Sequence, residues 1–69
     1  MFVAEIYRVI VKNQRPERYA SLWGAADRWR ETGGNAVVEQ VSENDDVLRV
    51  VSALELRRVV DRVRGQNAD

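Results

Sequence analysis

The segment from Pro16 to Gly34 constrains the fold of this chain most strongly, because both tryptophans lie in it within a helical period. On a helix, its apolar side chains share one face: Tyr19, Leu22, Trp23, Ala26 and Trp29. Proline suits the first position of a helix, where its missing N–H would have no partner, and Gly33 with Gly34 can adopt the left-handed conformation that ends one. The pattern predicts an amphipathic helix over residues 16–34 whose aromatic rings supply the largest share of the core.

Residues 2–12 are rich in β-branched and aromatic side chains and hold no glycine or proline, which is typical of a strand. Both faces of this strand are mostly apolar, whereas a strand with one solvated face alternates apolar and polar residues. We therefore expect both of its faces to be covered. A short polar connection follows, in which Asn13 is the best candidate for capping the helix that begins at Pro16.

The stretch after Gly34 has the pattern of a β-hairpin. Two β-rich runs, residues 36–42 and 47–51, are joined by four polar residues from Glu43 to Asp46. Such a turn between two apolar runs favours antiparallel pairing.

A second helix is predicted to begin at Ser52. Ser52 and Glu55 have the spacing of a capping box, in which each side chain accepts a hydrogen bond from the other residue's backbone N–H. The helix then shows an apolar stripe at helical spacing, formed by Leu56, Val59, Val60 and Val63. Gly65 is its expected C-cap.

These elements predict a single α+β domain over residues 1–65, with 66–69 as a frayed tail. The order β-α-β-β-α gives a three-stranded, mainly antiparallel sheet with both helices on one face, a split β-α-β unit like a truncated ferredoxin-like domain. We favour the arrangement with strand 47–51 in the middle. The alternative places strand 36–42 in the middle, parallel to strand 2–12.

Composition excludes most catalytic chemistry. The 69 residues include no cysteine and no histidine, so disulfides, zinc fingers and imidazole bases are excluded. Neither a nucleophile motif nor a phosphate-binding loop is present, and the acidic run from Glu43 to Asp46 lacks the spacing of a calcium loop. We expect no enzyme, no metal site and no cofactor.

The N-terminal residues lack the basic segment and uninterrupted apolar run of a signal peptide, and no apolar run reaches membrane-spanning length. We therefore expect a cytoplasmic protein that does not enter the membrane.

The formal net charge is zero, which disfavours a protein whose main task is to bind nucleic-acid phosphates. Four arginines nevertheless lie on the last predicted helix: Arg57, Arg58, Arg62 and Arg64. A small nucleic-acid-binding regulator that uses this arginine face is the alternative function.

The leading hypothesis is a non-catalytic protein-interaction module: an adaptor, a regulator or an inhibitor. Small stand-alone chains of this kind include phage and mobile-element accessory proteins that bind and block a larger host complex. Tryptophan and arginine are enriched at binding hot spots, so Trp29, at the edge of the apolar stripe, and Arg18 beside it are candidate contacts for a larger protein partner.

A homodimer is also predicted. Two helices cover one face of a three-stranded sheet, and the first strand leaves an apolar face whichever way it turns. A second copy could cover it by face stacking or by pairing of the first strands, with Val3, Tyr7, Val9 and Val11 as the expected contacts.

Overall fold

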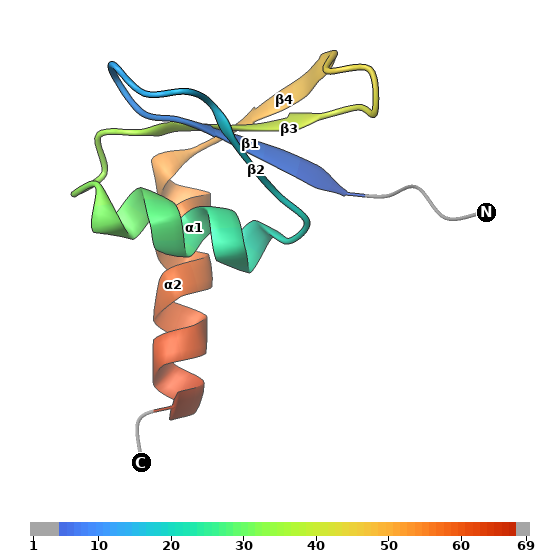
Figure 1. Cartoon of the computed structure of the whole chain (residues 1–69). Coiled ribbons are helices and arrows are strands. Elements are labelled where there is room, and N and C mark those ends of the chain that lie inside the picture. The colour runs from blue at the N-terminus through green and yellow to red at the C-terminus, as the bar shows by residue number, and fades with distance from the viewer. Residues whose placement is uncertain (1–4, 68–69) are drawn as a thin grey trace.

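The computed structural model describes residues 5–67, and within them the side chains of residues 5–63 (Figure 1). The described chain is an α+β fold with a four-stranded antiparallel sheet and two helices. Its elements are β1 (Ile6–Ile10), β2 (Glu17–Tyr19), α1 (Leu22–Glu31), β3 (Val37–Val41), β4 (Val47–Val51) and α2 (Ala53–Asn67).

Both helices lie on the same side of the sheet (Figure 1). α1 runs beneath the strands, whereas α2 crosses α1 and its C-terminal half extends beyond it. The α+β class is therefore confirmed. The expected three strands are wrong, because a fourth strand is present.

The additional strand is β2, which forms from residues that were predicted to begin the first helix. Glu17–Tyr19 pairs antiparallel with β1, and Tyr19 lies opposite Tyr7. Pro16 precedes this strand, and a proline without an N–H is tolerated at an edge strand as well as at a helix start. The proline signal therefore fits both structures, and the pairing with β1 decides between them.

The presence of β2 also changes the sheet order, which is β2-β1-β3-β4. Because β2 reverses the chain before α1 begins, β3 returns antiparallel to β1, and no parallel crossover forms. The favoured order with strand 47–51 in the middle is wrong. The alternative placed residues 36–42 correctly between two strands, but its parallel pairing is also wrong.

Helix α1 begins and ends with residues that satisfy its free backbone groups. Ser21, not Asn13, is the N-cap, and its Oγ accepts a hydrogen bond from the backbone N of Gly24 at 3.1 Å. At the other end Gly34 N donates to Trp29 O at 3.1 Å, and Gly33 N donates to Arg30 O at 3.0 Å. Both glycines have positive φ, and Gly33 occupies the left-handed position that follows the C-cap in a helix end with these two hydrogen bonds. The predicted glycine stop is confirmed.

The predicted hairpin is confirmed, since β3 and β4 are antiparallel neighbours joined by the polar turn. One irregularity interrupts it. Gln40 lies opposite Arg49 but Val41 lies opposite Val47, so Leu48 is an extra residue in β4, as in a β-bulge.

The start of α2 confirms half of the predicted capping box. Ser52 Oγ accepts from the backbone N of Glu55 at 3.2 Å. The carboxylate of Glu55 instead accepts two hydrogen bonds from Arg49, at 2.9 and 3.0 Å. Gly65 does not end the helix, which continues to Asn67, because a single glycine inside a helix costs only about 1 kcal/mol.

The core lies between the sheet and the helices and is built mainly from small aliphatic side chains. Its members are Tyr7, Val9, Ala25, Ala26, Ala36, Val38, Val51, Leu56 and Val60. Both tryptophans contribute less than expected, because Trp23 is 47% exposed and Trp29 is only partly buried against the core. Alanines, not tryptophans, occupy the buried face of α1, which lets the helix approach the sheet closely.

Candidate interaction surface

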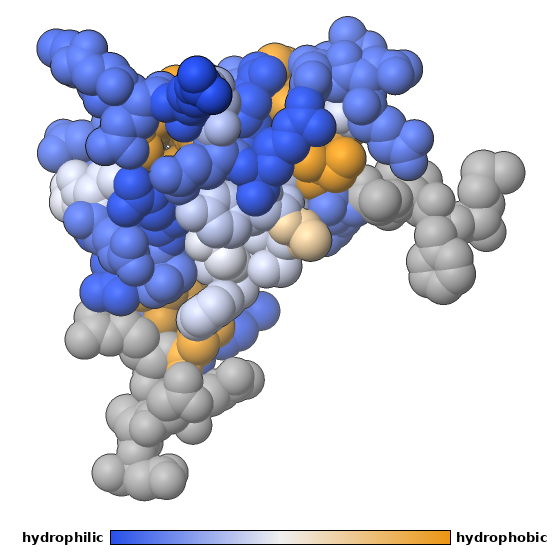
Figure 2. Space-filling model, in the orientation of Figure 1, coloured by the Kyte–Doolittle hydropathy of each residue, from blue (hydrophilic) through white to orange (hydrophobic). Residues whose placement is uncertain are grey.

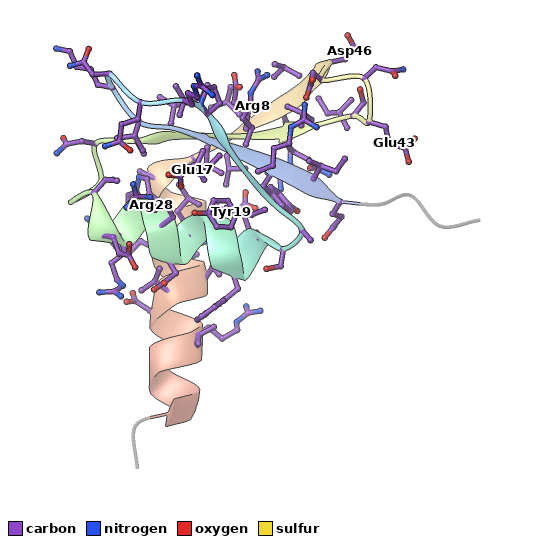
Figure 3. The ribbon with its side chains drawn as sticks, in the orientation of Figure 1. Arg8, Glu17, Tyr19, Arg28, Glu43 and Asp46 are labelled. Atoms are coloured by element: carbon purple, nitrogen blue, oxygen red, sulfur yellow. The ribbon has the colours of Figure 1, made fainter. Side chains whose placement is uncertain are left out.

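The face of the sheet opposite the helices has an ion pair at its centre. Arg8 of β1 lies opposite Glu39 of β3, and its Nε and Nη2 lie 3.0 and 2.7 Å from Oε1 of Glu39. Figure 3 shows Arg8 on the side of the ribbon away from α1. The two charged groups neutralise each other, and both side chains are mostly shielded from water.

A second ion pair on the same face joins parts of the sheet that are not adjacent. Arg18 of β2 lies opposite Arg8 and so points to this face, where its guanidinium pairs with Asp45 in the β3–β4 turn. The contact spans β1, because β1 separates β2 from β3. Arg18 therefore has an intramolecular role, and its predicted contact with a larger protein partner stays a prediction.

Exposed apolar side chains gather at the β3–β4 end of the fold. Of the six large hydrophobic residues that are exposed in the described part of the chain, five belong to β3, β4 or the start of α2. We call the four of them on β4 and at the start of α2 the β4 surface: Val47, Leu48, Val50 and Leu54. Leu48 is 57% exposed and Val50 is 61% exposed, and both lie on the edge strand β4.

Hydrophilic residues cover most of the face seen in Figure 2, and orange apolar patches interrupt them at the sheet and on α2. Single exposed apolar residues are common on soluble proteins, whereas a cluster of them along one strand marks an interaction surface.

The two edges of the sheet differ in their protection. β2 has three residues, follows Pro16 and carries Glu17 and Arg18, both of which are held in ion pairs. β4 has five residues, and Arg49 is its one charged side chain. Short, charged and proline-flanked strands resist pairing with another chain, whereas long apolar ones favour it. The β4 edge is therefore open to a partner strand, and the β2 edge is protected.

The residues predicted to form a homodimer interface lie elsewhere. Tyr7 is 2% exposed and Val9 is 0% exposed, because both face the helices. Val11 is partly buried against the same core, and Val3 lies outside the described residues. Pairing between first strands is also excluded, since β1 already has β2 and β3 on its two sides. The prediction that Tyr7 and Val9 are dimer contacts is therefore wrong.

The structure brings together two candidate residues from different hypotheses. Trp29 of α1 and Arg57 of α2 line one open hollow of about 480 Å³, together with Arg30, the glycine pair after α1, and Asp61. Arg30 is engaged by Asp27 at 3.0 Å, and Asp61 contributes the opposite charge to the lining. The hollow therefore has mixed charge and no dominant attraction for an anion.

The remaining candidate arginines lie on the outside of α2. Arg57, Arg58 and Arg62 are exposed, and none forms an ion pair with another side chain described in residues 5–63. The side chain of Arg64 lies outside the described ones.

Within residues 5–67, no group of three or more acidic side chains is placed to hold a metal ion. No described helix is long and apolar enough to cross a membrane. Every described buried side-chain nitrogen and oxygen has a hydrogen-bond partner.

Comparisons with known protein families, curated proteins and solved structures found no match to this chain.

The contact residues predicted from the sequence do not include Leu48 and Val50, the exposed residues of β4 on which the surface depends. A signal for them exists, because strand 47–51 is apolar on both alternating sides apart from Arg49. Its position at the edge of the sheet, which makes the second apolar side significant, depends on β2 and on the strand order.

Proposed function

We propose that this chain is a non-catalytic, cytoplasmic protein-interaction module that acts as an adaptor, a regulator or an inhibitor by binding a protein through the β4 surface. The observation that carries the proposal is the exposed apolar edge formed by Leu48 and Val50. An inhibitor of the phage or mobile-element type, which blocks a larger host complex, fits such a surface because it needs contact area and no catalytic group.

Two contributions make β4 suitable for binding. Its outer backbone groups can pair with an extended strand of a partner, which adds a strand to the sheet. Fully burying a Val or Leu side chain contributes roughly 1.5–3 kcal/mol, so Leu48 and Val50 together could supply a large part of a binding free energy. Arg49 between them donates to Glu55 on the helix side, and Val50 lies on the open face opposite Glu39.

The test is affinity capture of the tagged protein from its native cells, followed by quantitative mass spectrometry. We expect specific proteins to be captured by the parent and lost from the variant Leu48→Lys with Val50→Lys. Arg58→Glu with Arg62→Glu is the matched control, because it also changes two exposed side chains, and it should retain them. Equal capture by all three proteins would contradict the proposal.

A nucleic-acid-binding regulator is the second candidate, favoured by the three exposed α2 arginines without described ion-pair partners. Retention on a heparin column at low salt, repeated at higher salt, tests it, because phosphate contacts weaken steeply with salt. On the leading proposal, the parent and Arg58→Glu with Arg62→Glu both stay near background. Strong low-salt retention that the double variant loses would favour nucleic-acid binding instead.

A further inference from the structure

We infer that the occupant of the β4 edge is a second copy of this chain, which pairs its own β4 antiparallel to the first and joins the two sheets into one. This inference rests on the proposed function, because it takes the β4 surface to be the contact surface and names its partner.

The sequence of β4 is suited to pairing with itself. A two-fold axis at Arg49 places Leu48 of one copy opposite Val50 of the other. Both pairs beside the axis are therefore apolar. Leu48 and Val50 are both exposed, so this pairing brings exposed apolar side chains of the two copies next to each other.

The charge at the centre of this pairing is already balanced. The two Arg49 side chains would lie opposite each other, which is unfavourable for bare charges. Each guanidinium donates from Nη1 and Nη2 to the carboxylate of Glu55, so each arginine arrives with its own counter-charge. The chain also has zero net charge, so two copies experience no net long-range repulsion.

Stacking of two sheet faces fits the structure less well. The Arg8–Glu39 pair occupies the centre of the open face, and the Arg18–Asp45 pair crosses it. Stacking would remove these charges from water, which costs free energy that the existing ion pairs do not recover. Pairing at the edge leaves the surroundings of both ion pairs unchanged and covers the exposed apolar residues of β4.

The β-bulge at Leu48 and the small core bear on the strength of this contact. A bulge weakens an edge as a template, but Arg49, Val50 and Val51 remain in regular register with β3. The core of the monomer contains three alanines and few large side chains, so added apolar burial at β4 supplements what a chain of this length can bury alone.

Light scattering after size exclusion, over a dilution series, tests the inference on the full chain. We expect a mass twice the 7.9 kDa of the chain for the parent, and a monomer for Leu48→Lys with Val50→Lys. Val37→Lys is the matched control, because Val37 is exposed on the open face but lies on the internal strand β3, and it should remain dimeric.

A parent that is monomeric at every concentration, or a double variant that stays dimeric, would overturn the inference. A Val37→Lys variant that becomes monomeric would also overturn it, because that result indicates stacking of the sheet faces. Should the double variant not fold, as judged by circular dichroism, the parent alone decides. An equal mixture of isotope-labelled and unlabelled chains should show intermolecular contacts between the methyl groups of Leu48 and Val50, and their absence contradicts β4 pairing.

The outcome is separable from that of the proposed function. A monomeric parent whose captured proteins are lost from the double variant would refute the homodimer and leave the interaction module standing. A dimeric parent whose captured proteins do not depend on Leu48 and Val50 would support the homodimer and contradict the proposed interaction module.

Discussion

Glu17 of β2 and Arg28 of α1 form an ion pair in which Nε of Arg28 lies 3.0 Å from Oε1 of Glu17. The same carboxylate oxygen accepts a hydrogen bond from the hydroxyl of Tyr19 at 2.7 Å. Figure 3 shows the three side chains between the sheet and α1. These contacts attach the edge strand to the helix that follows it, and the Tyr19 hydroxyl, followed by Arg28, lowers the pKa of Glu17 below its ordinary value of 4.5.

Glu17→Gln should therefore lower the thermal stability of the protein at neutral pH. Because the folded-state pKa of Glu17 is depressed, its contribution is present above pH 4.5 and is lost as the pH falls through the folded value. The difference in melting temperature between parent and variant should shrink as the pH falls below 4.5, measured by circular dichroism. Glu43→Gln is the control, since Glu43 lies in the exposed turn and has no ion pair among the described side chains of residues 5–63. A difference that does not change with pH would contradict this role of the carboxylate.

The Arg8–Glu39 pair should show strong energetic coupling in a double-mutant cycle. Arg8→Met or Glu39→Met alone leaves a mostly buried charge without its partner, whereas the double variant removes both charges. We expect the double variant to lose less stability than the sum of the single variants by about 1 kcal/mol or more, in urea denaturation. The exposed Arg30–Asp27 pair in α1 serves as comparison, and its coupling should stay below about 0.5 kcal/mol. Similar coupling for the two pairs would show that burial does not strengthen the Arg8–Glu39 contact.

The end of α1 should discriminate between substitutions at Gly33 according to their backbone preference. Gly33 has φ of +72°, and a Cβ there would meet only Asn35 Nδ2, at 3.7 Å. The cost of Gly33→Ala is then conformational, about 1 kcal/mol, because L residues rarely adopt this φ. Asparagine tolerates the left-handed region better, so Gly33→Asn should cost less. Equal denaturation midpoints for the two variants would argue against the left-handed helix end.

The parts of the fold that could be predicted from the sequence are those that local patterns decide. The turn residues between strands 36–42 and 47–51, the Gly33-Gly34 stop and the Ser52 cap each satisfy nearby backbone groups, so their effect is local. The structure contains all three.

The parts that could not be predicted depend on pairing between distant segments. Residues 17–19 fit a helix face as well as a strand, and their register opposite residues 7–9 is not visible in their own pattern. A prediction that lacks β2 also gives the wrong strand order and the wrong covered face of β1. The interface was therefore placed on Tyr7 and Val9, which are buried, instead of on the edge strand β4.

The burial of Tyr7 leads to opposite expectations for two substitutions. Tyr7→Glu places a carboxylate in the core beside Val9 and Val38 and should unfold the monomer, not merely dissociate a dimer. Tyr7→Phe keeps the ring and should stay folded. Circular dichroism of both variants separates a core role from a surface role. If the Tyr7→Glu protein is folded, Tyr7 lies at the surface and not in the core.

The alkaline limb of the stability curve offers a further check on Tyr7. Burial, followed by the nearby charge of Glu5, raises the pKa of its hydroxyl above the ordinary value of 10.0. A raised folded-state pKa means that the contribution is present below pH 10.0 and is lost as the pH rises through the folded value, because unfolding releases the proton. The parent should therefore lose stability above pH 10.0 more steeply than Tyr7→Phe, measured by urea denaturation alongside tyrosinate absorbance. Tyr19, whose pKa is raised by its hydrogen bond to Glu17, provides the comparison. Tyr19→Phe should keep the part of the alkaline loss of stability that is due to Tyr7. If stability falls with pH equally steeply in the parent and in Tyr7→Phe, the Tyr7 hydroxyl is exposed to water.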